Sequence, residues 1–450
     1  MYGTIASGAA AHTQDGQRIT LAAAPSVRPK TAQLGRLGLR ADASSTKPEC
    51  PRSLDCDFIP AAYKQNSDDP SDYGNYDLAD RPKDMKVDTI VLHDTEETYD
   101  DAVGTFTNST SYVSAHYLVR SNDGHVTQFV PTKDVAWQAG NWYINSHSVG
   151  IEQEGFAIQG ATWYTERLYH STASLVQYLA AKYGVPLDRQ HIIGHDNVPG
   201  PTSDLVAGMH WDPGPFWDWA HFMSLIGKPI TATAGHGSPI VTINPGFASN
   251  KQQVTDCEGN QPVADQASSF VWLRTEPSST APLFSDEGLH TDGSAGTTCA
   301  DDWGDKASTG QQFVVADQYS DWTAIWFEGH KVWFENPRGD SVVHSSGFIV
   351  KPKAGLQSIP VYGDAYPESS AYPSDIPVQA ISPLMYSIKA GQSYVYGGKA
   401  YCDYYYAKTI DDSLPDDHTV VTGQDKYIRI QLGHRIAFVM ASDVDVVPAG

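Results

Sequence analysis

Residues 81–227 alternate short apolar runs with longer helical patterns, and this alternation constrains the fold more than any other feature of the chain. Strand patterns are predicted at residues 87–93, 114–119, 126–130, 148–154 and 191–195, and helical patterns at 99–108, 162–183 and 217–226. The pair Asp123-Gly124 between two strand patterns is a hairpin signal. Strands and helices mixed in this way, with hairpins, predict an α+β or α/β domain, and we expect the α/β form with a mixed central sheet flanked by helices.

The segments on either side of this domain differ in composition. Residues 1–48 are small, polar and rich in alanine, so we expect a disordered N-terminal segment. Residues 49–80 combine Cys, Pro, Tyr and Asp without a clear period, and we expect them to wrap a neighbouring domain. Residues 228–250 are rich in Pro, Gly, Thr and Ser, which is typical of a linker.

A weak internal repeat organises the rest of the chain. Residues 324–334 are similar to residues 428–438, and each segment has the pattern of a hairpin with a Gly turn followed by a His and a basic residue. The repeat predicts two small all-β barrels, over residues 251–350 and 357–450. The histidines after the two turns, His330 and His434, are interpreted as ordinary hairpin residues.

The charge balance excludes two classes of partner. The chain has 53 acidic and 30 basic side chains, for a net charge of −23. Nucleic-acid binding draws much of its affinity from Lys and Arg on phosphates, so no nucleic-acid partner is expected. No apolar run reaches the length of a membrane-spanning helix, so no membrane insertion is expected either.

The five cysteines give information about the cellular compartment of the protein. Cys50 and Cys56 are six residues apart, Cys257 and Cys299 can close a second loop, and Cys402 is left over. Two disulfides would fit a secreted chain, and five free thiols are the alternative. No CxxC spacing is present, which argues against zinc held by sulfur.

Four positions in residues 81–227 have the residue types of a metal hydrolase. His93 ends a buried strand pattern, His195 lies in a Gly-His-Asp sequence, and Asp212 follows His210 and Trp211. Two His and one Asp make a three-ligand zinc site with the fourth position open for water, and a nearby carboxylate can take the proton of that water. Glu152 supplies such a carboxylate on an otherwise apolar strand. With 16 His in the chain, composition alone does not fix this set.

A family resemblance selects among the histidines. The matching pieces are 90–93, 114–119, 136–140, 148–155, 194–196 and 212–216, in the family's order and at compatible spacings. Across the span from the first piece to the last, about a third of the chain, the sequence resembles the zinc N-acetylmuramoyl-L-alanine amidases of the type-2 amidase and peptidoglycan-recognition-protein family.

The resemblance implies a role for each matching residue. The zinc ligands would be His93, His195 and Asp212, and the general base would be Glu152. A branch of the family uses a Tyr at the position just before His116 in place of the Glu. This chain has Ala115 there, so Glu152 has no such competitor. Glu154 is the alternative base, because period two puts it on the same strand face as Glu152.

The sequence also departs from the family pattern. Where the family often has a Lys two residues before the Asp ligand, this chain has His210, whose protonated form would stabilise an oxyanion. The alternative is that His210 is itself the third ligand and Asp212 orients it. Cleft-lining residues are expected at His116, Trp137 and Trp142, with packing in the core as the alternative. The acidic residues that follow His93 are interpreted as solvated or as caps of the next helix.

The C-terminal repeats loosely resemble bacterial SH3-like domains. The likeness rests on residues 270–278 and 321–326, with residues 357–450 as a second, divergent copy. Such modules commonly bind cell-wall peptide or glycan, and a spacer that binds nothing is the alternative. The last 200 residues carry −13 of the net charge, so an anionic wall would repel them.

Together these observations predict a secreted zinc hydrolase that cleaves the amide bond between the N-acetylmuramic acid lactyl group and L-alanine in peptidoglycan or muropeptides. The expected location is extracellular or cell-wall associated, of a Gram-positive actinobacterial type. The alternatives are a non-catalytic peptidoglycan-binding protein and another zinc-dependent amide hydrolase or peptidase. An HExxH helix, the usual metalloprotease design, is not present in the sequence.

Overall fold

The computed structural model describes residues 35–36 and 47–449. The N-terminal segment predicted to be disordered, residues 1–48, lies almost wholly outside the described residues. Within the described residues, no helix has both the length and the apolar character needed to cross a membrane.

A six-stranded mixed sheet forms the centre of residues 81–227, as the sequence predicts. Its strand order is β11-β6-β10-β7-β8-β2. The first four strands run parallel, β7 and β8 form the antiparallel hairpin that the Asp-Gly pair indicates, and β2 lies parallel to β8 at the edge. The strands are β2 Cys56–Phe58, β6 Thr89–Leu92, β7 Tyr117–Val119, β8 Val126–Gln128, β10 Ser148–Gln153 and β11 Ile192–Gly194.

Helices flank this sheet. They are α1 Tyr99–Thr107, α2 Trp142–His147, α3 Gly160–Trp163, α4 Glu166–Tyr183 and α5 Trp219–Leu225. The long helix α4 begins later than predicted because the Thr165 side chain accepts a hydrogen bond from the Leu168 N–H as an N-cap, and it ends at Gly184 in the left-handed conformation. Its leucines pack against β6 in one apolar core.

Residues 49–80 lie along the central domain as short strands. β2 joins the sheet edge, β5 (Tyr76–Asp77) pairs with β9 (Val135–Ala136), and β3 (Lys64–Gln65) pairs with β4 (Tyr73–Gly74). The extension therefore adds strands to the domain that it adjoins.

The rest of the chain is rich in antiparallel strands. A five-stranded sheet has the order β17-β16-β15-β12-β18, a seven-stranded sheet has the order β21-β20-β26-β25-β22-β19-β27, and two small sheets are β13-β14 and β1-β24-β23. The strands of the five-stranded sheet and the β13-β14 pair are β12 Ile240–Ile243, β13 Phe270–Trp272, β14 Lys306–Ser308, β15 Gln312–Tyr319, β16 Trp322–Phe327, β17 His330–Glu335 and β18 Val342–Ser345. The remaining strands are β1 Gly35–Arg36, β19 Phe348–Pro352, β20 Ser358–Tyr362, β21 Pro383–Lys389, β22 Tyr394–Ala400, β23 Asp403–Tyr406, β24 Thr419–Thr422, β25 Tyr427–Gln431, β26 Ile436–Met440 and β27 Val444–Pro448.

Both segments of the internal repeat form hairpins, β16-β17 and β25-β26. The sheets cross the limits expected from sequence. β12, inside the expected linker, lies between β15 and β18 in the five-stranded sheet. β19 spans residue 350 and pairs with β22 and β27.

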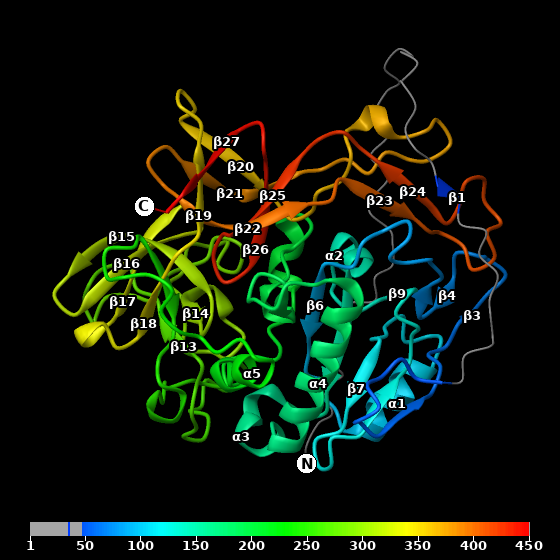
Figure 1. Ribbon diagram of the computed structural model, residues 1–450, viewed down its shortest axis with the longest axis horizontal. Helices are drawn as coiled ribbons and strands as arrows, with labels where there is room; N and C mark the ends of the chain where they lie inside the picture. Colours follow the sequence, from blue (N-terminus) through cyan, green and yellow to red (C-terminus); the bar gives the residue numbers. More distant parts are fainter. Residues whose placement is uncertain (1–34, 37–46, 450) are drawn as a thin grey trace.

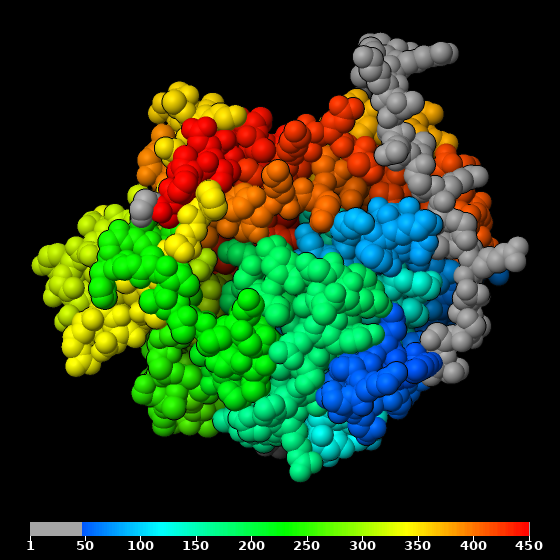
Figure 2. Space-filling view, viewed as in Figure 1, coloured from blue at the N-terminus to red at the C-terminus, as the bar shows by residue number. Residues whose placement is uncertain are grey.

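The C-terminal strands lie directly against the central domain. Figure 1 shows β22 to β26 along the top of the view, above α2 and β6, and Figure 2 shows the orange surface in contact with the blue and green ones. Val91 and Ile193 of the central sheet share an apolar core with Tyr366, Tyr427 and Phe438. The two parts of the chain therefore fold as one packed body.

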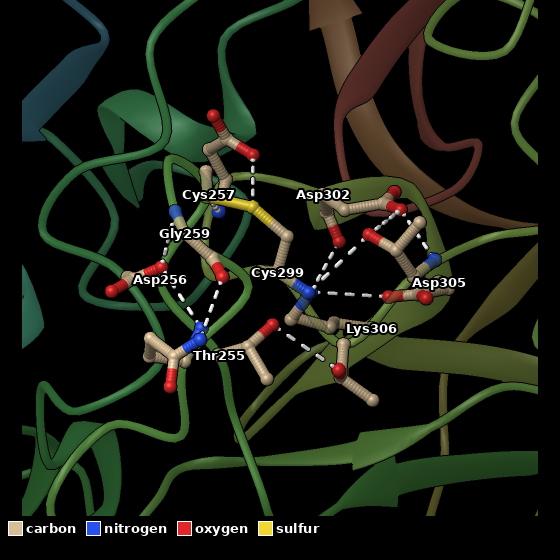
Figure 3. Close-up of a disulfide and its surroundings, with 12 residues drawn as sticks. Thr255, Asp256, Cys257, Gly259, Cys299, Asp302, Asp305 and Lys306 are labelled. Atoms are coloured by element: carbon tan, nitrogen blue, oxygen red, sulfur yellow. Dashed lines mark hydrogen bonds and ion pairs between the residues drawn. A yellow bond between two sulfur atoms is a disulfide. The ribbon is translucent and has the colours of Figure 1, made fainter.

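Both disulfides that the cysteine spacing indicates are present, Cys50–Cys56 and Cys257–Cys299, and Cys402 is a free cysteine. Figure 3 shows the second bridge beside the buried side chain of Lys306. The Lys306 Nζ donates to the Cys299 carbonyl at 3.0 Å and to Asp305 Oδ1 at 3.1 Å. This bridge is thereby connected to the start of β14.

Candidate metal centre

Parallel pairing brings the two candidate histidines to one edge of the sheet. β6 lies between β11 and β10. The last paired residues of β6 and β11 are directly followed by His93 and His195. Glu152 follows the residue of β10 that pairs with the end of β6. All three side chains therefore start from neighbouring backbone positions.

Asp212 reaches the same edge from the loop after the short 3₁₀ helix Ser203–Gly208. Its carbonyl accepts a hydrogen bond of 2.8 Å from the Asp196 N–H. A Cβ atom at Gly194 would lie 2.2 Å from Asp196 Oδ1 and 2.8 Å from Pro213 Cδ. The glycine before His195 is therefore required by the close approach of this loop.

The three candidate ligands converge. The Nδ1 atoms of His93 and His195 lie 3.1 Å apart. Asp212 places Oδ1 3.1 Å from the Nδ1 of His195 and Oδ2 3.4 Å from the Nδ1 of His93. Ligand atoms bound to one tetrahedral zinc ion lie roughly 3.3 Å from one another. The donor set and its spacing fit zinc, and all three residues are buried.

The electrostatics of the three side chains also suit a metal. Burial raises the pKa of Asp212, but the rings of His195, His210 and His93 outweigh burial and hold that pKa well below its usual range. Burial, only partly opposed by Asp212, lowers the pKa of His195 to about 3. The carboxylate is therefore charged and the imidazole neutral at neutral pH, which are the forms that ligate zinc.

Glu152 is placed to handle a proton at this centre. Its Oε1 lies 3.9 Å from the Nδ1 of His93, its side chain is 13% exposed, and its Oε2 has no hydrogen-bond partner. Burial, together with Asp212 and Asp94, raises the pKa of Glu152 well above its ordinary value. A cation beside it would favour its ionised form.

Glu154, the alternative base, is engaged elsewhere. Its Oε1 accepts a hydrogen bond of 3.1 Å from the Tyr99 N–H, and its Oε2 accepts one of 2.7 Å from the Ser121 N–H. The carboxylate thus holds the start of α1 and the end of β7, so the geometry favours Glu152 for proton transfer.

His210 lies at the rim of the centre. Its Nδ1 is 3.7 Å from Asp212 Oδ1, and its side chain is 52% exposed. The nearby carboxylate of Asp212 raises the pKa of His210 above its ordinary value. Among the described residues, three groups of candidate ligands have atoms that all lie within 4.8 Å of one another, and the group at this centre contains His93, His195 and Asp212 but not His210.

Comparison with known proteins shows which family the sequence matches. Residues 83–215 match the family model described as N-acetylmuramoyl-L-alanine amidase. These residues are similar to that family, and residues 81–227 around them are called the amidase domain.

Among curated proteins, the chain is 28% identical over 181 residues to N-acetylmuramoyl-L-alanine amidase A of Achromobacter lyticus, covering 38% of this chain and 94% of that protein. It is 35% identical over 125 residues to the 1,6-anhydro-N-acetylmuramyl-L-alanine amidase AmpD of Escherichia coli K12, covering 26% of this chain and 61% of AmpD. The chain thus spans about three fifths of the length of AmpD.

Two solved structures are also similar. A selenomethionine derivative of AmpD has 26% sequence identity and a TM-score of 0.29, covering 38% of this chain and 94% of that one. The Escherichia coli amidase AmiD in complex with anhydro-N-acetylmuramic acid-L-Ala-D-gamma-Glu-L-Lys has 19% identity and a TM-score of 0.27, covering 40% of this chain and 69% of that one.

The structure does not bring His116 to the metal-ligand group of the amidase domain. His116 is fully buried, its Nδ1 accepts the Gly150 N–H at 3.1 Å, and its Nε2 lies 2.9 Å from Arg81 Nη2. Burial and the Arg81 charge lower the pKa of His116 to about 3. This histidine is a packed core residue, and a buried ring cannot line a cleft.

The two tryptophans predicted to line the cleft are anchored to other segments. The Trp137 Nε1 donates to Asp77 Oδ2 at 2.7 Å. The Trp142 Nε1 donates to the Tyr405 carbonyl at 2.8 Å, and its ring stacks on Tyr405. They join the amidase domain to the N-terminal extension and to β23.

A hollow of about 420 Å³ lies beside the centre. Its lining residues are Glu96, Glu97, Thr98, Asp101, Gly104, Thr105, Asn108, Ser111 and Phe156. Glu96 connects the hollow to the centre, because its N–H donates to Asp94 Oδ1 and the N–H of Asp94 donates to Asp212 Oδ2. The hollow therefore presents carboxylates and the face of α1 to a ligand.

One contact of the centre is absent from the sequence-based predictions. The N–H of Asp94 donates to Asp212 Oδ2 at 3.1 Å, and Asp94 is buried instead of solvated. Its Oδ1 accepts the Glu96 N–H at 3.1 Å. The acidic residue directly after His93 was the available signal, but its partner lies 118 residues away.

Proposed function

We propose that this protein is a zinc-dependent N-acetylmuramoyl-L-alanine amidase that hydrolyses the bond between the N-acetylmuramic acid lactyl group and L-alanine in peptidoglycan or muropeptides. The observation that carries the proposal is the convergence of His93, His195 and Asp212, with Glu152 at 3.9 Å from the His93 Nδ1. The curated relatives, which are named as amidases of this bond type, support it.

Each site residue has a separate role in the proposed hydrolysis. When bound to His93, His195 and Asp212, zinc supplies Lewis-acid polarisation of the scissile carbonyl and lowers the pKa of the attacking water. Glu152 takes the proton of that water and delivers it to the leaving amine of L-alanine. His210, protonated and exposed at the rim, donates to the oxygen on which negative charge develops.

The hollow beside α1 is the proposed site of the stem peptide. It adjoins the centre at Glu96 and has room for several residues of extended peptide. Its polar lining offers hydroxyl, amide and carboxylate groups to a peptide backbone and to its amines.

We also propose that the protein is secreted and acts outside the cell or at the wall. The two disulfides support an oxidising compartment. The antiparallel sheets of the C-terminal part are proposed to include SH3-like modules, with the β16-β17 and β25-β26 hairpins as their repeated element.

Mass analysis of the products from a defined muropeptide tests the function. We expect a free stem peptide beginning with L-alanine and a sugar product that keeps its lactyl group. Purified protein should contain about one zinc per chain, and removal with a chelator should abolish turnover until zinc is returned. Cleavage at another bond, or full turnover without metal, would contradict the proposal.

A further inference from the structure

The turn of the β25-β26 hairpin lies against the two loops that carry candidate metal ligands. The Arg435 guanidinium donates to the carbonyl of His195 at 3.2 Å, to the carbonyl of Val198, and to the carbonyl of His210 at 2.8 Å. His195 belongs to one loop, and His210 is two residues before Asp212 in the other. One side chain from the C-terminal part thus holds both loops.

His434 makes a second connection to the same loop. Its Nε2 lies 2.9 Å from Asp196 Oδ2, and its carbonyl accepts the Asn197 Nδ2 at 3.0 Å. The ring is buried. The interpretation of His434 as an ordinary hairpin residue is therefore wrong, whereas its counterpart His330 lies partly exposed beside Glu287.

The turn is itself supported from behind. The His434 Nδ1 lies 2.9 Å from the Lys306 carbonyl, and the Arg435 Cζ lies 3.6 Å from the centre of the Trp303 ring. Lys306 is held to the loop of the Cys257–Cys299 bridge (Figure 3). The arginine is thus fixed on one side by an aromatic ring and on the other by three carbonyls.

The burial of Arg435 implies a specific geometry. The residue is 6% exposed, and burial lowers its pKa to about 10, so the guanidinium stays charged at neutral pH. A buried charge is costly unless its donors are satisfied. In Arg435 the Nη1 and Nη2 atoms are satisfied by the three carbonyls, in the fixed directions of a planar guanidinium, whereas Nε has no hydrogen-bond partner. The positions of the His195 and His210 carbonyls are therefore constrained relative to each other.

We propose that Arg435 is a positioning residue of the metal centre: it fixes the spacing between the His195 and Asp212 loops, so that the amidase site is complete only with the C-terminal hairpin in place. The proposal rests on zinc binding by the proposed function. It assigns a role in metal affinity to the C-terminal part of the chain, which lies outside the residues 83–215 that match the amidase family model.

Arg429 provides a matched control in the same hairpin. It is also buried, and its Nη1 donates to the Gln190 carbonyl at 3.0 Å while its Nη2 donates to Asp88 Oδ1 and Thr89 Oγ1 at 3.1 Å. These contacts join the hairpin to the start of β6 and to the residue two before β11, away from the ligand loops. Arg429→Gln therefore removes a comparable buried bridge without touching the metal centre.

The test uses the full chain, with zinc affinity measured by competition with a chromophoric chelator and the Co²⁺ absorption spectrum as a reporter of ligand geometry. We expect Arg435→Gln to weaken zinc binding at least tenfold and to change the Co²⁺ spectrum, the size typical of residues that orient metal ligands. Arg435→Lys, which keeps the charge but not the fork, should give an intermediate affinity. Arg429→Gln should bind zinc within twofold of the unaltered protein.

Three results would overturn the proposal. The first is an unchanged zinc affinity and Co²⁺ spectrum in both Arg435 variants. The second is a loss of zinc affinity in Arg429→Gln as large as that in Arg435→Gln. The third is a zinc affinity of Arg435→Lys equal to that of the unaltered protein. If Arg435→Gln does not fold, as judged by circular dichroism, Arg435→Lys against Arg429→Gln decides the question. Absence of zinc binding in the unaltered protein would instead refute the proposed function itself, and this inference with it.

Discussion

Glu152 combines burial with an oxygen that has no hydrogen-bond partner, next to the candidate ligand His93. Replacement by Gln keeps the shape and removes the proton acceptor. We expect Glu152→Gln to retain zinc and to lose turnover by about 10²- to 10⁴-fold, the usual contribution of a general base. Metal content and the rate of stem-peptide release measure the two effects.

Glu154→Gln is the control for this change. It removes a carboxylate on the same strand that is bound to two backbone N–H groups. We expect a lower melting temperature and near-normal turnover of the folded protein. A loss of turnover as large as that of Glu152→Gln would move the base to Glu154.

His210 makes the rate depend on pH. Its pKa is raised by the nearby carboxylate of Asp212, so its charge is present below that pKa and is lost as the pH rises through it. A lysine keeps its charge to about pH 10. We therefore expect His210→Lys to extend activity to more alkaline pH than the unaltered protein, in a pH profile of the initial rate. Identical alkaline limits would remove His210 from oxyanion stabilisation.

At the scale of elements, Glu49 joins the N-terminal extension to α4 and to the segment after β8. Its carboxylate pairs with Lys182 and accepts the Thr132 N–H at 2.7 Å. Burial would raise its pKa, but Lys182, Thr132 and Gln128 outweigh burial and lower the pKa to about 2.

A folded-state pKa below the unfolded value stabilises the protein above the unfolded pKa and is lost as the pH falls through the folded pKa. We expect Glu49→Gln to lower the free energy of unfolding at pH 7 by on the order of 2 kcal/mol, after allowance for solvent screening. The difference should shrink between about pH 4.5 and pH 2. Denaturant unfolding at pH 7 and pH 3 measures it, and a constant difference would show that the charge is not responsible.

The features of this molecule that could be predicted from the sequence are those set by residues close together in the chain. His93 and His195 each end a strand pattern that the sequence shows, and the family resemblance selected them, whereas the parallel pairing that places both strand ends at one edge is seen only in the structure. The helix α2 was not predicted, because six residues are too short to show a helical period. β12 was not predicted because its four residues, three of them apolar, lie within a Pro- and Gly-rich segment. The role of His434 depends on Asp196, 238 residues away, which no local pattern contains.

At the scale of the whole molecule, the C-terminal part is both packed on the amidase domain and strongly acidic. It shares an apolar core with the central sheet and holds the ligand loops through Arg435. It also carries −13 of the net charge of −23. Its contacts therefore fix it to the amidase domain. Binding to an anionic wall would need aromatic contacts and hydrogen bonds strong enough to overcome charge repulsion.

That repulsion gives a prediction for wall binding. Added salt screens exposed charges, with a Debye length of about 30 Å at 0.01 M and about 10 Å at 0.1 M. If the C-terminal sheets bind an anionic wall through aromatic groups and hydrogen bonds, the bound fraction should rise with salt. Sedimentation of the inactive Glu152→Gln variant with isolated walls, at about 0.01 M and 0.1 M salt, measures it without degrading the walls. Release by salt would show that local basic groups mediate the binding. The absence of binding at either salt concentration would identify the C-terminal part as a support of the amidase domain alone.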